Sequence, residues 1–157
     1  MIRSTTKIPI KTKVGTFVLE MSAKGLYAVK FPAATSGAGD LFPLRRVMSR
    51  QKLDLSGFTP FQRNVYAVLR KIPVGKTVTY GELAKRAGYL GAARAVGTAM
   101  KKNRLPLVIP CHRVIPASGG LGEYAAGKKW KRFLLAWEKI SSKSIRVSMC
   151  QGVRNAK

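Results

Sequence analysis

The alternation of apolar and polar residues divides the chain into an N-terminal part patterned as β-strands and a longer part patterned as helices. Residues 16–21 and 25–31 are strand-like runs joined by a short turn, which predicts a β-hairpin. Residues 7–11 are predicted to add a third strand. Loop composition over residues 32–39 separates these strands from a short helix that is predicted over residues 40–50.

The helical part begins with a clear start signal. Thr59 is predicted to cap a helix with Pro60 in its first position, and Gln62 closes a capping box three residues after the cap. Pro73 ends this helix. Within this helix the apolar residues recur at the spacing of one helical face, which is expected to be buried: Phe61, Val65, Val68, Leu69 and Ile72.

Two short helices are predicted next, with a tight glycine-containing turn between them. The first begins at the cap Thr79, with Glu82 completing a second capping box, and ends near Gly88. The second runs over residues 92–102. This arrangement predicts a helix-turn-helix, and the alternative is an ordinary pair of core helices. Small residues and cations on the exposed face favour the helix-turn-helix, because they permit close approach to phosphates: Ala93, Arg94, Gly97 and Lys101.

The last predicted helix spans residues 128–139, and its aromatic residues at helical spacing are expected to lie in the core. Before it, residues 118–122 form a glycine-rich loop that we expect to shape a pocket, because the sequence lacks the context of a phosphate-binding loop. After it, residues 141–157 have the composition of a basic tail, in which residues 145–149 are consistent with a short strand.

The charge balance indicates the kind of partner. There are 30 Lys and Arg against 6 Asp and Glu, a net charge of +24 in 157 residues. An excess this large favours nucleic acid over a merely solvated basic surface, and no long basic amphipathic helix favours a membrane. Because no apolar run is long enough to span a bilayer and no signal peptide is evident, we expect a soluble protein. It would be cytoplasmic and associated with the nucleoid, or nuclear in a eukaryote.

One stretch contains residues that could take part in a chemical reaction. Cys111 directly precedes His112, the only histidine in the chain, and apolar residues flank both. A lone cysteine is often an inert core residue, whereas a neighbouring base can convert its thiol to a thiolate. The two side chains would diverge on extended backbone, so a water bridge is the simpler connection. Glu138 borders the apolar face of the last helix, and its partner is either His112 or a nearby cation. Cys111 and Cys150 are too few for a disulfide framework or an ordinary zinc site.

A series of motifs resembles one known family. Over residues 59–139 their order and spacing are similar to those of the O6-alkylguanine-DNA alkyltransferases, also called methylated-DNA–protein-cysteine methyltransferases. The motifs are FTPFQR at 58–63, VTYGELA at 78–84, AARAVG at 92–97, Asn103, PCHRV at 110–114, GGLGEY at 119–124 and LLAWE at 134–138. The N-terminal third resembles the family only in its strand pattern.

The resemblance implies direct DNA repair in a single, irreversible turnover. Cys111 would accept the alkyl group from O6-alkylguanine in double-stranded DNA, chiefly O6-methylguanine, with O4-methylthymine as a further candidate. His112 would act as its base through a water, and Glu138 would orient His112. Asn103 would brace the turn that carries the site, and Tyr80 would donate a proton to the departing guanine. No cofactor, no metal, no membrane and no obligate protein partner are implied, and the protein would be a monomer.

Further residues are implied in binding. Arg94 would fill the space left by the flipped nucleotide, and main-chain groups near Val114 and Ala125 would bind the edge of the base. The implied DNA contacts are Tyr80, Ala93, Arg94, Gly97, Lys101 and Arg113. The implied pocket residues are Met100, Pro106, Val114, Tyr124, Ala125 and Ala126. The chain departs from the family at Ala126, where a glycine is usual, and the extra methyl is expected to narrow the pocket.

The expected architecture is α/β (α+β). Residues 1–56 would form a small β-sheet domain, RNase H-like by resemblance, and residues 57–140 a mostly helical domain with the helix-turn-helix. The alternative function is that of a non-catalytic relative that binds and flips the damaged base, and Cys111 argues against it because such relatives lack the nucleophile. A cysteine hydrolase does not suit adjacent Cys and His, and a basic architectural protein would have no use for a buried Cys-His-Glu set.

Overall fold

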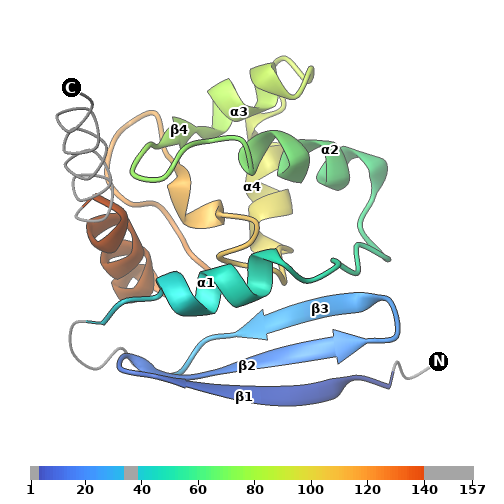
Figure 1. Cartoon of the computed structure of the whole chain (residues 1–157). Coiled ribbons are helices and arrows are strands. Elements are labelled where there is room, and N and C mark those ends of the chain that lie inside the picture. Colours follow the sequence, from blue (N-terminus) through green and yellow to red (C-terminus); the bar gives the residue numbers. More distant parts are fainter. Residues whose placement is uncertain (1–3, 34–38, 140–157) are drawn as a thin grey trace, which may run out of the picture.

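The computed structural model describes residues 4–33 and 39–139, and it shows a mixed α/β protein with a small antiparallel sheet and several helices (Figure 1). The sheet has three strands in the order β1-β2-β3. They are β1 (Thr6–Thr12), β2 (Gly15–Ser22) and β3 (Gly25–Lys30). This confirms the predicted hairpin and the third strand beside it. The predicted tail and its strand at 145–149 lie outside the described residues.

The start of β3 shows why glycine occupies position 25. Gly25 has a φ of 127°, and a Cβ atom there would lie 2.1 Å from the carbonyl oxygen of Lys52. The close approach lets the amide of Leu26 donate to that carbonyl at 2.7 Å, and Leu26 also forms an isolated parallel bridge with Leu53. The sheet is therefore joined to the connector that leads into the helical part, and any side chain at position 25 would push the two segments apart.

Four labelled helices follow the sheet, and the caps explain where two of them start. They are α1 (Phe42–Ser49), α2 (Pro60–Leu69), α3 (Tyr80–Arg86) and α4 (Ala93–Lys101). At α2 the predicted capping box is complete: Thr59 and Gln62 each bond the other's backbone amide, at 3.2 and 3.0 Å. At α3 the Thr79 side chain accepts from the Glu82 amide, but the Glu82 carboxylate pairs with Arg86. The second capping box is thus only half formed.

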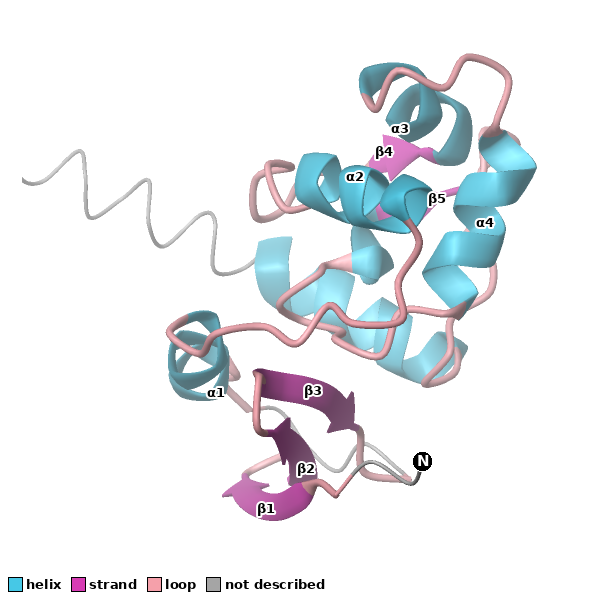
Figure 2. Ribbon diagram, turned by 90° about the vertical axis from the view of Figure 1, so that its right-hand side faces the viewer, coloured by secondary structure: helices cyan, strands magenta, loops and turns pink. Residues whose placement is uncertain are grey.

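A two-stranded parallel pair and a last helix complete the helical part. The strands are β4 (Val78–Thr79) and β5 (Val114–Ile115), and residues 128–139 are helical as predicted. Figures 1 and 2 show the sheet and α1 on one side of the molecule and α2, α3 and α4 on the other. Among the described residues, no helix combines the length and apolar character needed to cross a membrane.

The two sides share one hydrophobic core. Phe17 of β2 packs edge-on against Phe31 and Trp130, with ring centroids 5.1 and 5.6 Å away. Trp130 in the last helix is 2% exposed and donates its indole N–H to the carbonyl of Pro32 at 3.1 Å. Trp130 therefore packs against the sheet, and the aromatic residues of the last helix belong to the core or pack against it, as their spacing predicted.

Arg104 forms a second link between the two sides. Its guanidinium donates to the carbonyl oxygens of Tyr27, Asp54 and Ser56, each at 2.8 Å. The same group lies over the rings of Tyr27 and Phe58, at 4.3 and 3.9 Å from their centroids. One side chain thus satisfies three main-chain carbonyls on β3 and on the connector, while its own backbone continues from Asn103 toward Cys111.

We predict that Arg104→Met lowers the free energy of unfolding by about 2–3 kcal/mol, because the substitution leaves partly buried carbonyls without their charged donor. Chemical denaturation followed by circular dichroism measures this difference. Arg70→Met is the matched control, since Arg70 is exposed on the surface after α2 and should change stability by less than about 0.5 kcal/mol. Equal losses in both variants would contradict the role assigned to Arg104.

Candidate active site

A cavity of about 940 Å³ lies between the α3–α4 pair and the loop of residues 116–125. Cys111 lies in its wall. The other lining residues come from both sides of the cavity: Thr79, Tyr80, Gly81, Ala93, Arg94, Gly97, Met100 and Lys101 from the helical pair, and Pro116, Ala117, Ser118, Gly122, Glu123, Tyr124 and Ala125 from the loop. A thiol in the wall of a concave site is accessible to a small group but shielded from bulk water.

The backbone at Cys111 differs from the extended conformation considered in the sequence analysis. Cys111–Arg113 form a single turn of 3-10 helix, η1, that leads directly into β5. Successive side chains on such a turn are rotated by about a third of a circle, so Cys111 and His112 still point in different directions. The cysteine reaches the cavity, whereas His112 is 1% exposed.

Asn103 holds the loop that delivers Cys111. Its side-chain amide donates to the carbonyl of Ile109 at 3.0 Å, and its side-chain oxygen accepts from the amide of Leu105 at 2.9 Å. Within the same loop Leu107 has a φ of 71°, which is unusual for a residue other than glycine. The bracing role predicted for Asn103 is consistent with these two bonds, which close the loop at both ends and help to maintain this costly backbone conformation.

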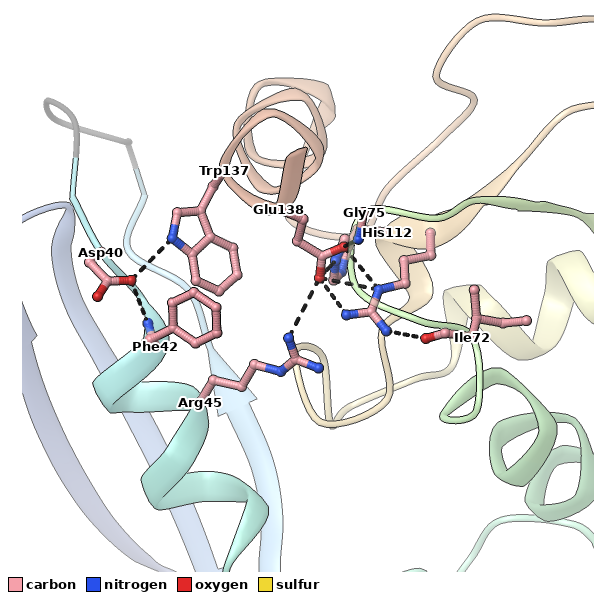
Figure 3. A network of polar contacts seen from close by, with 9 residues as sticks. Asp40, Phe42, Arg45, Ile72, Gly75, His112, Trp137 and Glu138 are labelled. Carbon is pink, nitrogen blue, oxygen red and sulfur yellow. Dashed lines mark hydrogen bonds and ion pairs between the residues drawn. The ribbon is translucent and has the colours of Figure 1, made fainter. Parts of the chain in front are cut away.

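The buried carboxylate of Glu138 lies next to the imidazole of His112 (Figure 3). The Nε2 atom of His112 is 2.9 Å from Oε1 of Glu138, and both side chains are 1% exposed. The amide of Gly75 donates to Oε2 of the same carboxylate at 3.2 Å. Because the carboxylate accepts, we assign the imidazole proton to Nε2. The Nδ1 atom is then an acceptor, and it is buried without a hydrogen-bond partner among the described residues.

The protonation states follow from burial and from these partners. Burial raises the pKa of the Cys111 thiol, while Asn103, Tyr124 and Lys131 lower it, and the net direction is upward. Burial also lowers the pKa of His112. For Glu138, burial favours the neutral acid, but the hydrogen bonds from His112 and Arg113 outweigh it and hold the pKa at about 2. The resting site at neutral pH therefore holds a thiol, a neutral imidazole and a carboxylate, and the thiol needs a base.

The structure places Arg113 in the interior, not on the surface where a DNA contact was expected. Arg113 is 1% exposed. Its Nε atom donates to both carboxylate oxygens of Glu138, at 3.1 and 2.9 Å, and its Nη1 atom donates to the carbonyl of Ile72. The expected DNA-binding role of Arg113 is corrected accordingly, since a guanidinium with these buried partners is not available to a phosphate. Both partners considered for Glu138, the histidine and a cation, are present together.

The expected pocket residues divide into two groups. Met100, Tyr124 and Ala125 line the cavity, as do the expected DNA contacts Tyr80, Ala93, Arg94, Gly97 and Lys101. Pro106, Val114 and Ala126 do not line it. Val114 is fully buried, and Ala126 packs against the hydrophobic core. The expectation that the Ala126 methyl narrows the pocket is therefore not supported, because this half-buried residue packs against the core and does not line the cavity.

The glycine-rich loop shapes the cavity through one position in particular. Gly122 has a φ of 67°, and a Cβ atom there would lie 2.9 Å from the ring of Pro116 and 3.6 Å from the hydroxyl of Tyr80. A side chain at this position would displace the loop and crowd Tyr80. This supports the prediction of a pocket-forming loop over a phosphate-binding one.

Lys131 is a site residue that the sequence analysis missed. It is fully buried, and its ammonium donates to the carbonyl of Val114 at 2.7 Å and to that of Glu123 at 3.5 Å. Burial lowers its pKa, and Cys111 raises it, which places the two groups within electrostatic reach. The sequence did contain a signal for Lys131. This residue shares a helical face with Leu134 and Glu138, and a lysine on an apolar face needs a buried partner.

Comparison with known proteins identifies relatives of this chain. The sequence model described as "6-O-methylguanine DNA methyltransferase, DNA binding domain" matches residues 60–140. The methylated-DNA–protein-cysteine methyltransferase of Mycolicibacterium paratuberculosis is 51% identical over 91 residues, which are 58% of this chain and 54% of that protein. The protein of the same name from Mycobacterium bovis is 46% identical over 112 residues, covering 69% of this chain and 67% of that protein. The chain thus spans about half the length of several curated relatives that it matches.

A solved structure extends the similarity to the whole fold. The crystal structure of Mycobacterium tuberculosis OGT in complex with DNA has a TM-score of 0.70 and 33% sequence identity, and the match covers 85% of this chain and 92% of that one. The similarity therefore includes the N-terminal sheet, where the sequence resemblance was confined to a strand pattern. The matched domain model and the relatives together show that this chain belongs to the 6-O-methylguanine DNA methyltransferase family.

Proposed function

We propose that this protein repairs O6-alkylguanine in double-stranded DNA by transferring the alkyl group to the Sγ atom of Cys111. The observation that carries the proposal is the placement of Cys111 in the wall of the cavity, followed in the chain by a buried His112 that is hydrogen-bonded to Glu138. The family and the names of the relatives support the same reaction. The transfer is stoichiometric, because a thioether is a poor leaving group and no second thiol among the described residues lies near it.

In the proposed reaction, Nδ1 of His112 accepts the thiol proton of Cys111 through a bridging water, and Glu138 stabilises the imidazolium at Nε2. The thiolate attacks the saturated carbon attached to O6. The new S–C bond forms as the C–O6 bond breaks, and the electron pair of that bond remains on the guanine. Tyr80 supplies the proton that neutralises the guanine. Burial raises the pKa of Tyr80, so its phenol is protonated at neutral pH and can donate.

The proposed DNA interface is the outer surface of α3 and α4, acting as a helix-turn-helix. The two helices pack against each other, and Arg94 and Lys101 are exposed at the rim of the cavity. A base inside a duplex cannot reach Cys111, so it must be flipped out, and a side chain must fill the gap. Arg94 is the proposed filler because it is long, charged and located where the cavity opens. Ala93 and Gly97 beside it leave room for the backbone of the DNA.

We propose an RNase H-like N-terminal domain over residues 1–56 and an alkyl-acceptor domain over residues 57–140, with residues 141–157 as a basic tail. The protein would act as a monomer in the compartment that contains the DNA. A non-catalytic protein that only binds the lesion is the second candidate, and the cysteine in the cavity wall disfavours it.

A mass measurement tests whether Cys111 accepts the alkyl group. Incubation with an oligonucleotide duplex that contains O6-methylguanine should add the mass of one methyl group to the protein, located on the Cys111 peptide by mass spectrometry. Cys111→Ala should gain no mass. Cys150→Ala is the matched control and should be methylated at the wild-type rate. Tight binding of the duplex without any mass gain would favour the lesion-binding alternative, and methylation of Cys111→Ala would overturn the assignment.

The second prediction concerns Arg94. Arg94→Ala should slow methyl transfer from duplex DNA by roughly 30-fold, because the unstacking cost of about 2 kcal/mol is no longer offset. Transfer from the free base O6-methylguanine should be unaffected, since nothing has to be flipped. Arg70→Ala removes the same charge at an exposed position that does not line the cavity, and should slow the duplex reaction only slightly. Equal slowing with duplex and free base would contradict a role in flipping.

A further inference from the structure

The N-terminal helix α1 is docked beside the residue that orients the proposed base (Figure 3). The carboxylate oxygen Oδ1 of Asp40 accepts from the indole N–H of Trp137 at 3.2 Å and from the amide of Phe42 at 2.9 Å. The ring of Phe42 packs on Trp137 with centroids 5.0 Å apart. Trp137 directly precedes Glu138, so these contacts fix the first turn of α1 against the end of the last helix.

From this position α1 directs a second guanidinium at Glu138. Nη1 of Arg45 is 3.9 Å from Oε1 of Glu138, at the limit of an ion pair and beyond hydrogen-bond distance. The Arg45 side chain is 26% exposed, and Leu44 beside it is buried in the core and anchors the helix. Arg45 therefore acts on the carboxylate by charge, whereas Arg113 holds it by direct hydrogen bonds.

The charges around His112 come from three elements. Glu138 on the last helix is the only acid among them, Arg113 follows His112 in η1, and Arg45 lies on α1. The thiol of Cys111 precedes the imidazole in the chain. One carboxylate thus faces two guanidiniums, and a protonated His112 would be a third cation in a buried space. Like charges in such surroundings disfavour ionisation.

We propose that Arg45 is a positioning residue by which the N-terminal part of the chain controls the proposed base: it biases Glu138 and disfavours a positive charge on His112, so that the imidazole enters the reaction neutral. The assignment of His112 as a base rests on the proposed function. The effect of Arg45 on the imidazole does not, and it can be measured without DNA.

The direction of the effect is consistent with the balance of charges. Burial is the main cause that lowers the pKa of His112, Arg113 and Arg45 lower it further, and Glu138 raises it. A base must be unprotonated before it can accept a proton, so a low pKa keeps His112 competent at mildly acidic pH. Loss of the Arg45 charge should raise the pKa of His112 and shift the acidic limb of the alkyl-transfer rate to higher pH.

The single histidine makes a direct experiment possible, because the imidazole gives one signal with no overlap. We would titrate the imidazole of the full-length protein by NMR in the wild type and in Arg45→Lys, Arg45→Met and Arg45→Glu. Arg46→Met is the matched control, because Arg46 is the next residue on α1, is exposed and does not contact Glu138 in any of the described interactions. Thermal unfolding by circular dichroism verifies that each variant is folded.

The quantity compared among the variants is the pH at the midpoint of the titration of the His112 signal. Arg45→Lys and Arg46→Met should match the wild type, Arg45→Met should titrate at higher pH, and Arg45→Glu higher still. The inference is overturned if Arg45→Met and Arg45→Glu titrate with the wild type, or if Arg46→Met shifts as far as Arg45→Met. A conservative variant that fails to restore the wild-type position would also contradict a role exerted by charge.

Kinetics then separate this inference from the proposed function. In single-turnover methyl transfer, Arg45→Met should lose rate relative to the wild type as the pH falls, and approach the wild-type rate at alkaline pH. A merely structural role would lower the rate by the same factor at all pH values, and that result would count against the proposal. If no methyl is transferred by any variant while the NMR order holds, the inference about Arg45 stands and the proposed function fails.

Discussion

One buried carboxylate, Glu138, is the group on which the arrangement of the site depends. An ionised carboxylate removed from water is costly unless its oxygens are paired, and those of Glu138 accept from His112, Arg113 and the amide of Gly75. These partners lie on η1 and on the segment after α2, and Arg45 adds a charge from α1. The need to neutralise one anion therefore holds together four segments that are distant in the sequence, and the orientation of His112 follows from it.

The same constraint explains the states of the two neighbouring reactive groups. Burial keeps both Cys111 and His112 in their neutral forms, so the site carries little net charge on its reactive atoms before a substrate arrives. In the proposed reaction, proton transfer from the thiol to the imidazole would create an ion pair inside the protein, and the carboxylate bonded to His112 would stabilise it. The ammonium of Lys131, which donates to the carbonyl of Val114, acts on the thiol in the opposite direction to burial and lowers the pKa of Cys111. Because burial outweighs this effect, the Cys111 thiol is protonated in the resting protein, and the proposed reaction would need the base to form the thiolate.

Much of the fold could be predicted because its causes lie within a few residues of one another. The complete capping box at Thr59 and Gln62, the hairpin of β2 and β3 and the aromatic face around Trp130 are set by local hydrogen bonds and by helical or strand spacing. The capping box predicted at Thr79 forms only in part, because the Glu82 side chain pairs with Arg86, one turn along the same helix. Even there the position of the helix start was correct, since the Thr79 side chain alone caps it.

The sequence by itself determined the elements, the adjacent Cys111 and His112, and the acid that would have to find a partner. Tertiary structure alone decided which cation pairs with Glu138, that Arg113 is directed inward, that Ala126 packs against the core and that α1 brings Arg45 to the site. The physical reason is that a buried charge is satisfied by whichever group is nearest in space, and with 30 basic residues the chain offers too many candidates for spacing to choose among them. Packing of the last helix against α1 and η1 makes that choice.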